Sequence, residues 1–394
     1  MPGAFLVSSM LMHQGHKSAT PLRVFLPAPQ ASLKVAGVPA IVRTAFALKY
    51  LAPETVLLWG DGLALFGPWR DKLGHLHLHS AHDGIPPAGF VDGGADLLAV
   101  SADGFAEARG LAELQAAARA KSRPARWVHH GQTVAVYYPS GSEWARCQPD
   151  KLLDPAEADE FRTTDHAWWP ADSAEAIHRA KKALYDRLPQ PNDGYIAQLD
   201  RRISIPISKL LVRTPVTPNQ ITASALVLGL LGSWLIATGV HSWQVAGALI
   251  LWFCVILDGC DGEVARLKLL MSPGGGRFDI ITDNIVHVAL FLGIAAAMWR
   301  DDPSAKVLLP LAVLLTGFAA CGFSVWWLVL RHPKDARHGA QVLVDKLSSR
   351  DFIYLIVVLA FLDKLGWFLW AAAIGSHVVN LAFWVVCRDQ KAEG

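Results

Sequence analysis

The chain has little charge, little cysteine and no excess of one sign. Charged residues make up 18% of its 394 residues, and the formal net charge is +2, whereas soluble proteins carry about 25% charged residues. This balance excludes a disordered chain and a strongly basic nucleic-acid-binding protein, so we expect no nucleic-acid partner. The five cysteines are scattered without a CxxC pair, which argues against a disulfide framework or a zinc site.

Residues 1–172 mix charged, polar and apolar segments in the way of a soluble domain. Short apolar runs at 24–28, 55–60, 96–102 and 133–138 predict buried strands, and helical patterns at 38–51 and 106–120 lie between them. This alternation predicts an α/β domain with a largely parallel sheet covered by helices. The first 18 residues lack a basic segment followed by a long apolar run, so we expect no signal peptide and a cytoplasmic domain.

Apolar residues are concentrated after position 214. Six apolar segments lie at roughly 219–240, 244–265, 279–299, 305–330, 352–363 and 366–387, and most approach the ~20 residues that cross a bilayer. Helices buried in a soluble core are the alternative, but a soluble domain rarely needs so many of this length. We therefore predict a polytopic α-helical membrane domain of six transmembrane helices over residues 214–394, preceded by the soluble α/β domain.

Lysine and arginine are distributed unevenly over the loops of the predicted membrane domain. Ten follow the second, fourth and sixth segments, and three lie on the other side. Because positive loops face the cytoplasm, we expect an inner-membrane protein with both termini and the loop after the second helix in the cytoplasm.

Residues 173–213 join the two halves. A helix is expected from Asp172 to Leu188, with Asp172 and Glu175 in capping-box spacing. Apolar residues then recur every three or four positions between Tyr195 and Leu211, accompanied by basic residues. This pattern predicts a helix on the cytoplasmic membrane surface, bent at Pro206; an amphipathic core helix is the alternative.

Acidic residues interrupt the second and third apolar segments. Asp258 and Asp261 are spaced i,i+3, and Asp279 and Asp283 are spaced i,i+4, so each pair shares one helical face. Each charge near mid-bilayer costs about 2.5–3.5 kcal/mol, and four carboxylates brought together would also repel. A divalent cation offsets both costs, and an all-oxygen donor set suits Mg²⁺ or Mn²⁺, with one or two ions. A salt-bridge cluster is the alternative, but one arginine leaves too much negative charge.

Glycine and arginine accompany these carboxylates. Gly259 and Gly262 flank Asp261, Gly274 to Gly276 precede the third segment, and Arg266 lies one turn on. Glycine lets a ligand or a neighbouring backbone approach closely, and arginine can bind a phosphate through two hydrogen bonds. The cluster therefore predicts a pyrophosphate site.

The spacing of these residues resembles the CDP-alcohol phosphotransferase family, whose pattern is D-x2-D-G-x2-A-R-x8-G-x3-D-x3-D. All eight positions are matched, by Asp258, Asp261, Gly262, Ala265, Arg266, Gly275, Asp279 and Asp283. The stretch TPNQIT at 217–222 is also similar to the family. The resemblance covers about residues 195–394.

The resemblance implies an enzyme that transfers a substituted phosphate from a CDP-alcohol to an acceptor hydroxyl and releases CMP. It implies metal ligands at Asp258, Asp261, Asp279 and Asp283, with Asp283 also the general base. It implies a CDP site formed by Asp258, Gly262, Ala265, Arg266 and Gly275, and a homodimer in the bilayer. A transporter or channel with a cation-binding acidic cluster is the alternative function, disfavoured because the acids gather at one edge of the predicted spans.

The first domain also carries a resemblance. Residues 33–60 are similar to part of a sugar-nucleotide transferase domain, but the glycine-rich phosphate loop expected near the chain start is absent from residues 3–18. We therefore expect a degenerate, non-catalytic domain. His75, His77 and His79 alternate, as on one strand face, where a solvated face is favoured over a metal site; Asp61 is assigned to a turn rather than a relic metal ligand.

Overall fold

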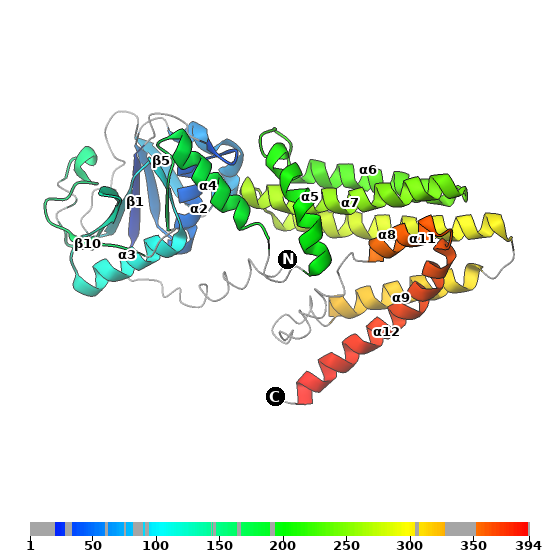
Figure 1. Cartoon of the computed structure of the whole chain (residues 1–394). Coiled ribbons are helices and arrows are strands. Elements are labelled where there is room, and N and C mark those ends of the chain that lie inside the picture. The colour runs from blue at the N-terminus through cyan, green and yellow to red at the C-terminus, as the bar shows by residue number, and fades with distance from the viewer. Residues whose placement is uncertain are drawn as a thin grey trace. The chain divides into compact units, whose positions relative to one another are not determined.

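The computed structural model describes residues 20–392 apart from 28–33, 60–61, 75, 82–89, 91–93, 143, 145–146, 164–166, 190–193, 304–306 and 328–351. The chain forms two compact units. Residues 2–191 together with 266–270 form an α/β unit, and residues 192–265 and 271–394 form a helical unit (Figure 1).

The α/β unit is built on a seven-stranded sheet of order β10-β8-β9-β6-β1-β4-β5. Its strands are β1 (Leu22–Pro27), β4 (Thr55–Trp59), β5 (His77–Ala81), β6 (Asp96–Val100), β8 (Ala125–His129), β9 (Gln132–Tyr138) and β10 (Asp159–Phe161). Strands β6, β1, β4 and β5 pair in parallel, as do β8 and β10, whereas β9 is antiparallel to both of its neighbours. Two small sheets join β2 (Lys34–Val35) to β3 (Val38–Pro39) and β7 (Gly104–Ala106) to β11 (Trp168–Pro170).

Both faces of the central strands are covered. Val24 and Leu26 of β1 pack in the cluster that contains residues of α2 (Ala40–Leu48) and α3 (Ala108–Lys121), whereas Phe25 packs in a second cluster with Trp144. Because alternate side chains of a strand point to opposite faces, a continuous apolar run is what a strand buried on both faces requires. The four predicted apolar strands are therefore present, although Ala28, Gly60 and Asp61 lie outside the described residues.

One local expectation needs correction. Helix α4 (Ala174–Asp186) is capped by Ser173, whose hydroxyl accepts a hydrogen bond from the Ala176 N–H, so the cap predicted at Asp172 is wrong by one residue. The prediction of a largely parallel sheet is confirmed; β9 is the antiparallel exception and follows β8 through a tight hairpin. His77 and His79 do lie on one strand, β5, and both are exposed, while His75 and the first 19 residues lie outside the described part.

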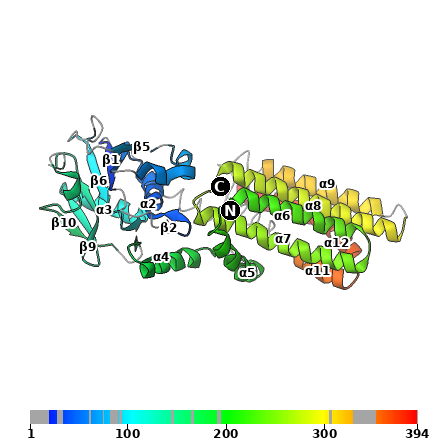
Figure 2. The ribbon, with the colours of Figure 1, turned by 90° about the horizontal axis from the view of Figure 1, so that it is seen from above.

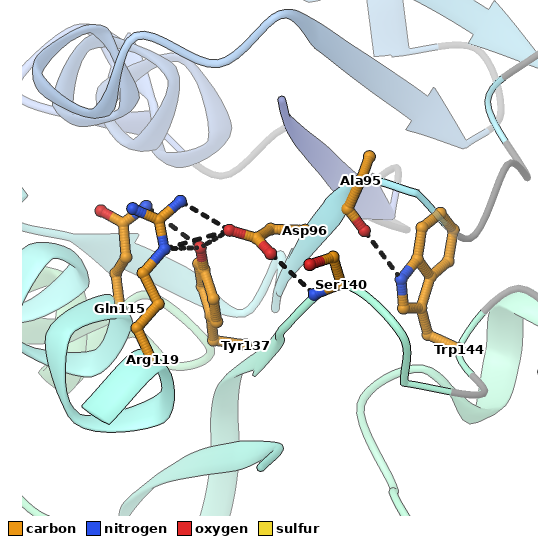
Figure 3. Close-up of polar contacts among 7 residues, drawn as sticks. All are labelled: Ala95, Asp96, Gln115, Arg119, Tyr137, Ser140 and Trp144. Atoms are coloured by element: carbon orange, nitrogen blue, oxygen red, sulfur yellow. Dashed lines mark hydrogen bonds and ion pairs between the residues drawn. The ribbon is translucent and has the colours of Figure 1, made fainter. Parts of the chain in front are cut away.

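A buried carboxylate holds the amino end of β6 (Figure 3). Asp96 accepts hydrogen bonds from the Tyr137 hydroxyl (2.6 Å), from Arg119 Nη2 (2.5 Å) and from the Ser140 N–H (2.7 Å). Burial, and then the hydrogen bond to Asp96, raises the pKa of the Tyr137 phenol. Ligands of open α/β sheets bind at the carboxyl ends of strands, so this group at the opposite end is structural.

We expect Asp96→Asn to destabilise the α/β unit by about 3 kcal/mol, because breaking a buried ion pair leaves polar groups without a charged partner. The measurement is denaturant unfolding of the full chain followed by tryptophan fluorescence, since Trp144 donates to the Ala95 carbonyl beside the site. The matched control is Asp159→Asn, which removes the exposed pair with Lys121. Equal midpoints for the two variants would contradict a structural role for Asp96.

The helical unit contains an amphipathic helix followed by longer apolar ones. Its helices are α5 (Tyr195–Leu211), α6 (Pro218–Ala237), α7 (His241–Leu267), α8 (Pro273–Asp301), α9 (Leu308–Val325), α11 (Phe352–Phe361) and α12 (Leu365–Ala392). Helices α6, α7 and α8 run side by side (Figures 1 and 2). Glycines permit this: a Cβ added to Gly232 would lie 2.8 Å from the Gly247 carbonyl, and one added to Gly293 would lie 2.6 Å from the Ser233 carbonyl.

Three of the predicted spans are confirmed by length and composition. Helices α6, α7 and α8 are long and apolar enough to cross a membrane, while the described apolar parts of α9, α11 and α12 are shorter. Large apolar side chains such as Trp234, Val227 and Ile280 are more than 60% exposed. Such an apolar outer surface is unfavourable in water. The chain is thus an integral membrane protein, and the count of six spans stays a prediction.

Candidate metal and substrate site

Three of the predicted aspartates meet between α7 and α8. Asp258 and Asp261 on α7 and Asp279 on α8 each place one carboxylate oxygen within 4.8 Å of the other two. Asp258 and Asp261 are both 7% exposed, and Asp279 is half-buried. Spacing on each helix puts the side chains on one face, and the turn between the helices brings the two faces together.

The start of α8 is set by local sequence. The Ser272 hydroxyl caps the helix by accepting a hydrogen bond from the Gly275 N–H (3.1 Å), and Pro273 occupies the first turn. A Cβ added to Gly275 would lie 3.1 Å from Ser272 Oγ and 3.2 Å from Asn219 Oδ1. A larger residue at Gly275 would therefore displace the Ser272 or Asn219 side chain where the amino end of α8 approaches α6, one turn before Asp279.

The carboxylate cluster fits a hard divalent cation. The buried Oδ1 of Asp279 has no hydrogen-bond partner among the described residues, and an unsatisfied buried carboxylate oxygen is costly. Asp261 is oriented by the Thr222 hydroxyl of α6, which donates a hydrogen bond to it. Three convergent carboxylates without histidine or cysteine match the oxygen ligands that Mg²⁺ and Mn²⁺ prefer.

Asp283 is not one of these three carboxylates, and it lines a pocket beside them. The pocket lies among α6, α7, α8 and α11, and Asp283 lines it together with Thr222, Asp258 and His287. Asp283 follows Asp279 by one helical turn, so its carboxylate lies further from the amino end of α8. Asp283 is therefore placed beside the cation cluster rather than within its three closest oxygens.

His287 is a pocket residue that the sequence analysis did not single out. Its ring centroid lies 5.2 Å from that of Phe352 and 6.4 Å from those of Phe291 and Phe318. The i+4 spacing of His287 from Asp283 could have indicated it, since this spacing places both residues on one face of α8. Thr222 was noted only as the end of the TPNQIT stretch, and its contact with Asp261 was not predicted because that contact is made between two helices.

The remaining predicted residues follow Asp261 along α7. Gly262 is half-buried and Ala265 is buried, both in the last turns before α7 ends at Leu267. Arg266 is half-buried at the same end of the helix. None of these residues, nor Gly275, lines the described pocket, so a CDP site formed by them remains a prediction.

Sequence comparison identifies the region that carries this site. Residues 215–386 match the family described as CDP-alcohol phosphatidyltransferase. A curated relative, the bifunctional IPC transferase and DIPP synthase of Archaeoglobus fulgidus, is 33% identical over 214 residues, which are 52% of this chain and 40% of the relative. The phosphatidylinositol phosphate synthase of Mycobacterium tuberculosis is 32% identical over 109 residues, 26% of this chain and 48% of that protein.

Solved structures give weaker similarity. The Mycobacterium tuberculosis phosphatidylinositol phosphate synthase with CDP-DAG bound is 19% identical with a TM-score of 0.37, covering 47% of this chain and 94% of that one. A 4-diphosphocytidyl-2C-methyl-D-erythritol synthase from Anaerococcus prevotii is 10% identical with a TM-score of 0.28, covering 42% of this chain and 99% of that one. The chain spans less than half the length of the two curated relatives.

Proposed function

We propose that the chain is a membrane transferase that moves a substituted phosphate from a CDP-alcohol to an acceptor hydroxyl and releases CMP, because residues 215–386 match the family described as CDP-alcohol phosphatidyltransferase. The observation that carries the proposal is the convergence of Asp258, Asp261 and Asp279, with Asp283 lining the adjacent pocket. The product belongs to phospholipid or polar head-group phosphodiester synthesis. The names of the curated relatives, an IPC transferase and a phosphatidylinositol phosphate synthase, support that class.

The four carboxylates divide between metal binding and proton transfer in this proposal. Asp258, Asp261 and Asp279 would hold one or two Mg²⁺ or Mn²⁺ ions, which when bound screen the phosphate charge and stabilise the departing CMP. Asp283 takes the proton of the acceptor hydroxyl, and the oxygen of that hydroxyl bonds to the phosphorus that carries the alcohol group of the donor. The phosphoanhydride bond to the cytidylyl phosphate breaks, and CMP leaves with that electron pair. Thr222 holds Asp261 in the orientation that this requires.

The surrounding assembly completes the proposal. The apolar outer surface of α6, α7 and α8 faces lipid, and the carboxylate ends of α7 and α8 lie on the cytoplasmic side of the inner membrane. The α/β unit acts as a degenerate nucleotidyltransferase-like domain without catalysis of its own, and two chains associate through the membrane helices. A transporter is disfavoured, because the three carboxylates form one compact cluster instead of a series of sites along a path.

The test is CMP release by the purified full chain in lipid nanodiscs with Mg²⁺ or Mn²⁺. Donors are CDP-diacylglycerol and CDP-inositol, and acceptors are inositol, inositol 1-phosphate and glycerol 3-phosphate. We expect CMP and a phosphodiester product from at least one pair, and no product after chelation of the metal. Cation flux into vesicles without CMP release from any pair would contradict the proposal and favour the transporter.

Arg266→Ala is expected to raise KM for the CDP-alcohol about 10-fold or more, since a bidentate guanidinium-phosphate contact is lost. The measurement is initial rate against donor concentration at saturating acceptor. Arg277→Ala is the control, because Arg277 is an exposed arginine on α8 that lies outside the family pattern. An unchanged KM in Arg266→Ala would remove the phosphate role of Arg266.

A further inference from the structure

A buried ion pair joins α5 to the segment of α7 that carries two of the aspartates. Glu263 follows Asp261 by two residues, which places it about 200° around the helix, away from the carboxylate cluster. Glu263 is fully buried, and its Oε1 accepts hydrogen bonds from Arg201 Nη1 and Ser204 Oγ of α5, each 2.6 Å long. The Glu263 carboxylate therefore binds to α5 and is not part of the carboxylate cluster.

Other contacts fix α5 at the same place. The Cys260 thiol donates to the Ser204 carbonyl over 3.5 Å, and a Cβ added to Gly259 would lie 3.9 Å from Arg201 Nη1. Asp200 accepts a hydrogen bond from the Tyr354 hydroxyl of α11. Helix α5 therefore contacts the turn of α7 between Asp258 and Asp261 from the side opposite α8.

Stability alone does not account for this pair. A buried ion pair is often no more stabilising than apolar side chains of the same size. Here Glu263 Oε2 has no hydrogen-bond partner among the described residues, which adds a desolvation cost. Buried ionic groups of this kind are best explained where they fix the register of one helix against another.

We propose that Arg201 and Glu263 are positioning residues that fix α5 against α7 and thereby hold Asp258 and Asp261 in the geometry that binds the cation. The proposal rests on the metal site of the proposed function. Arg201 and Glu263 touch neither cation nor substrate, and they act through the backbone of the α7 turn. Their side chains set where the two ligands of α7 stand relative to Asp279.

The test measures Mn²⁺ binding to the purified full chain by electron paramagnetic resonance, alongside its thermal unfolding. In Arg201→Met with Glu263→Met, one positive and one negative charge are removed together, so the net charge near the cluster is unchanged. We expect a melting temperature close to that of the wild type and a Kd for Mn²⁺ raised about 10–100-fold, the range found when groups that orient metal ligands are lost. Arg202→Met, at an exposed neighbour on α5, is the matched control and should bind as the wild type does.

The possible outcomes distinguish a positioning role of this ion pair from a purely structural one. Wild-type Mn²⁺ affinity in the double variant means that the pair is only structural, and the proposal is overturned. If the double variant does not melt cooperatively, Arg201→Lys decides: it keeps the charge but loses the planar fork, and we expect a Kd raised about threefold or more, while an unchanged Kd overturns the proposal. A wild-type chain that binds no Mn²⁺ would overturn the metal site itself, which distinguishes that failure from this one.

Discussion

Asp283→Asn is expected to lower kcat by about 10²–10⁴-fold, the range associated with loss of a general base. The amide has nearly the shape of the carboxylate, but it does not accept the proton of the acceptor hydroxyl. Because Asp283 stands outside the three oxygens that lie within 4.8 Å of one another, we expect the Kd for Mn²⁺ to change less than threefold. The measurements are CMP release at saturating substrates and Mn²⁺ binding by electron paramagnetic resonance.

Asp363→Asn is the matched control for this variant. Asp363 lies in the same unit, is highly exposed and is 3.5 Å from His241 Nδ1, so its loss should leave turnover unchanged. Wild-type turnover in Asp283→Asn would remove the assignment of Asp283 as the base. A large loss of Mn²⁺ affinity would instead show that Asp283 is also a ligand, as the family pattern implies.

The helical spacing of the aspartates indicates which side chains share a helix face. It does not indicate which carboxylates of the two helices come close together. Asp279 and Asp283 share one face of α8, and the prediction placed all four carboxylates on the cation. In the structure one carboxylate oxygen from each of Asp258, Asp261 and Asp279 lies within 4.8 Å of the other two, and a ligand role for Asp283, one turn further along α8, stays a prediction. The packing of α7 against α8 decides which of their turns lie opposite each other. This register cannot be predicted from the residue spacing within one helix.

Strand prediction missed β10, which has three residues at an edge of the sheet. It carries aspartate and glutamate and lacks the apolar run that a central strand needs, whereas the alternation of His77 and His79 did indicate the other edge strand, β5. The turn between β8 and β9 was not predicted. It is formed by His130 and Gly131, which both have positive φ, of 49° and 81°. Two residues of that conformation make the tight turn of a hairpin, which is why β9 runs antiparallel to β8.

The fifth predicted span is not confirmed, because the described helix α11 is short. The fifth apolar segment is described as a helix of 10 residues, Phe352–Phe361, and at about 1.5 Å per residue it extends half the ~30 Å of a bilayer core. The sequence already indicated this difference, because the fifth apolar segment, 352–363, is shorter than the segments of α6, α7 and α8. Its amino end nevertheless belongs to the candidate site, because Phe352 and Ile353 line the pocket beside Asp283.

Asp279→Asn is expected to have two opposite effects on stability. Without metal, like charges about 5 Å apart repel by about 3 kcal/mol per pair at an effective dielectric constant of about 20, so removing one charge should raise the melting temperature of the metal-free protein. With metal, the variant loses a ligand, and its Kd for Mn²⁺ should rise by about 100-fold or more. Wild-type protein at 100 times its Kd gains about 2.7 kcal/mol from the bound ion, and the variant should lose most of that gain.

The measurement is thermal unfolding of both proteins over a Mg²⁺ titration, with Asp363→Asn again as the control of equal charge change. A shared cation predicts that the two melting curves cross: the variant is the more stable protein after chelation, and the wild type is the more stable one at saturating metal. A salt-bridge cluster predicts the reverse, because Asp279→Asn would then remove an attraction and melt at a lower temperature whether or not metal is present. The sign of the change after chelation therefore separates a cation site from a structural cluster without any assumption about the substrates.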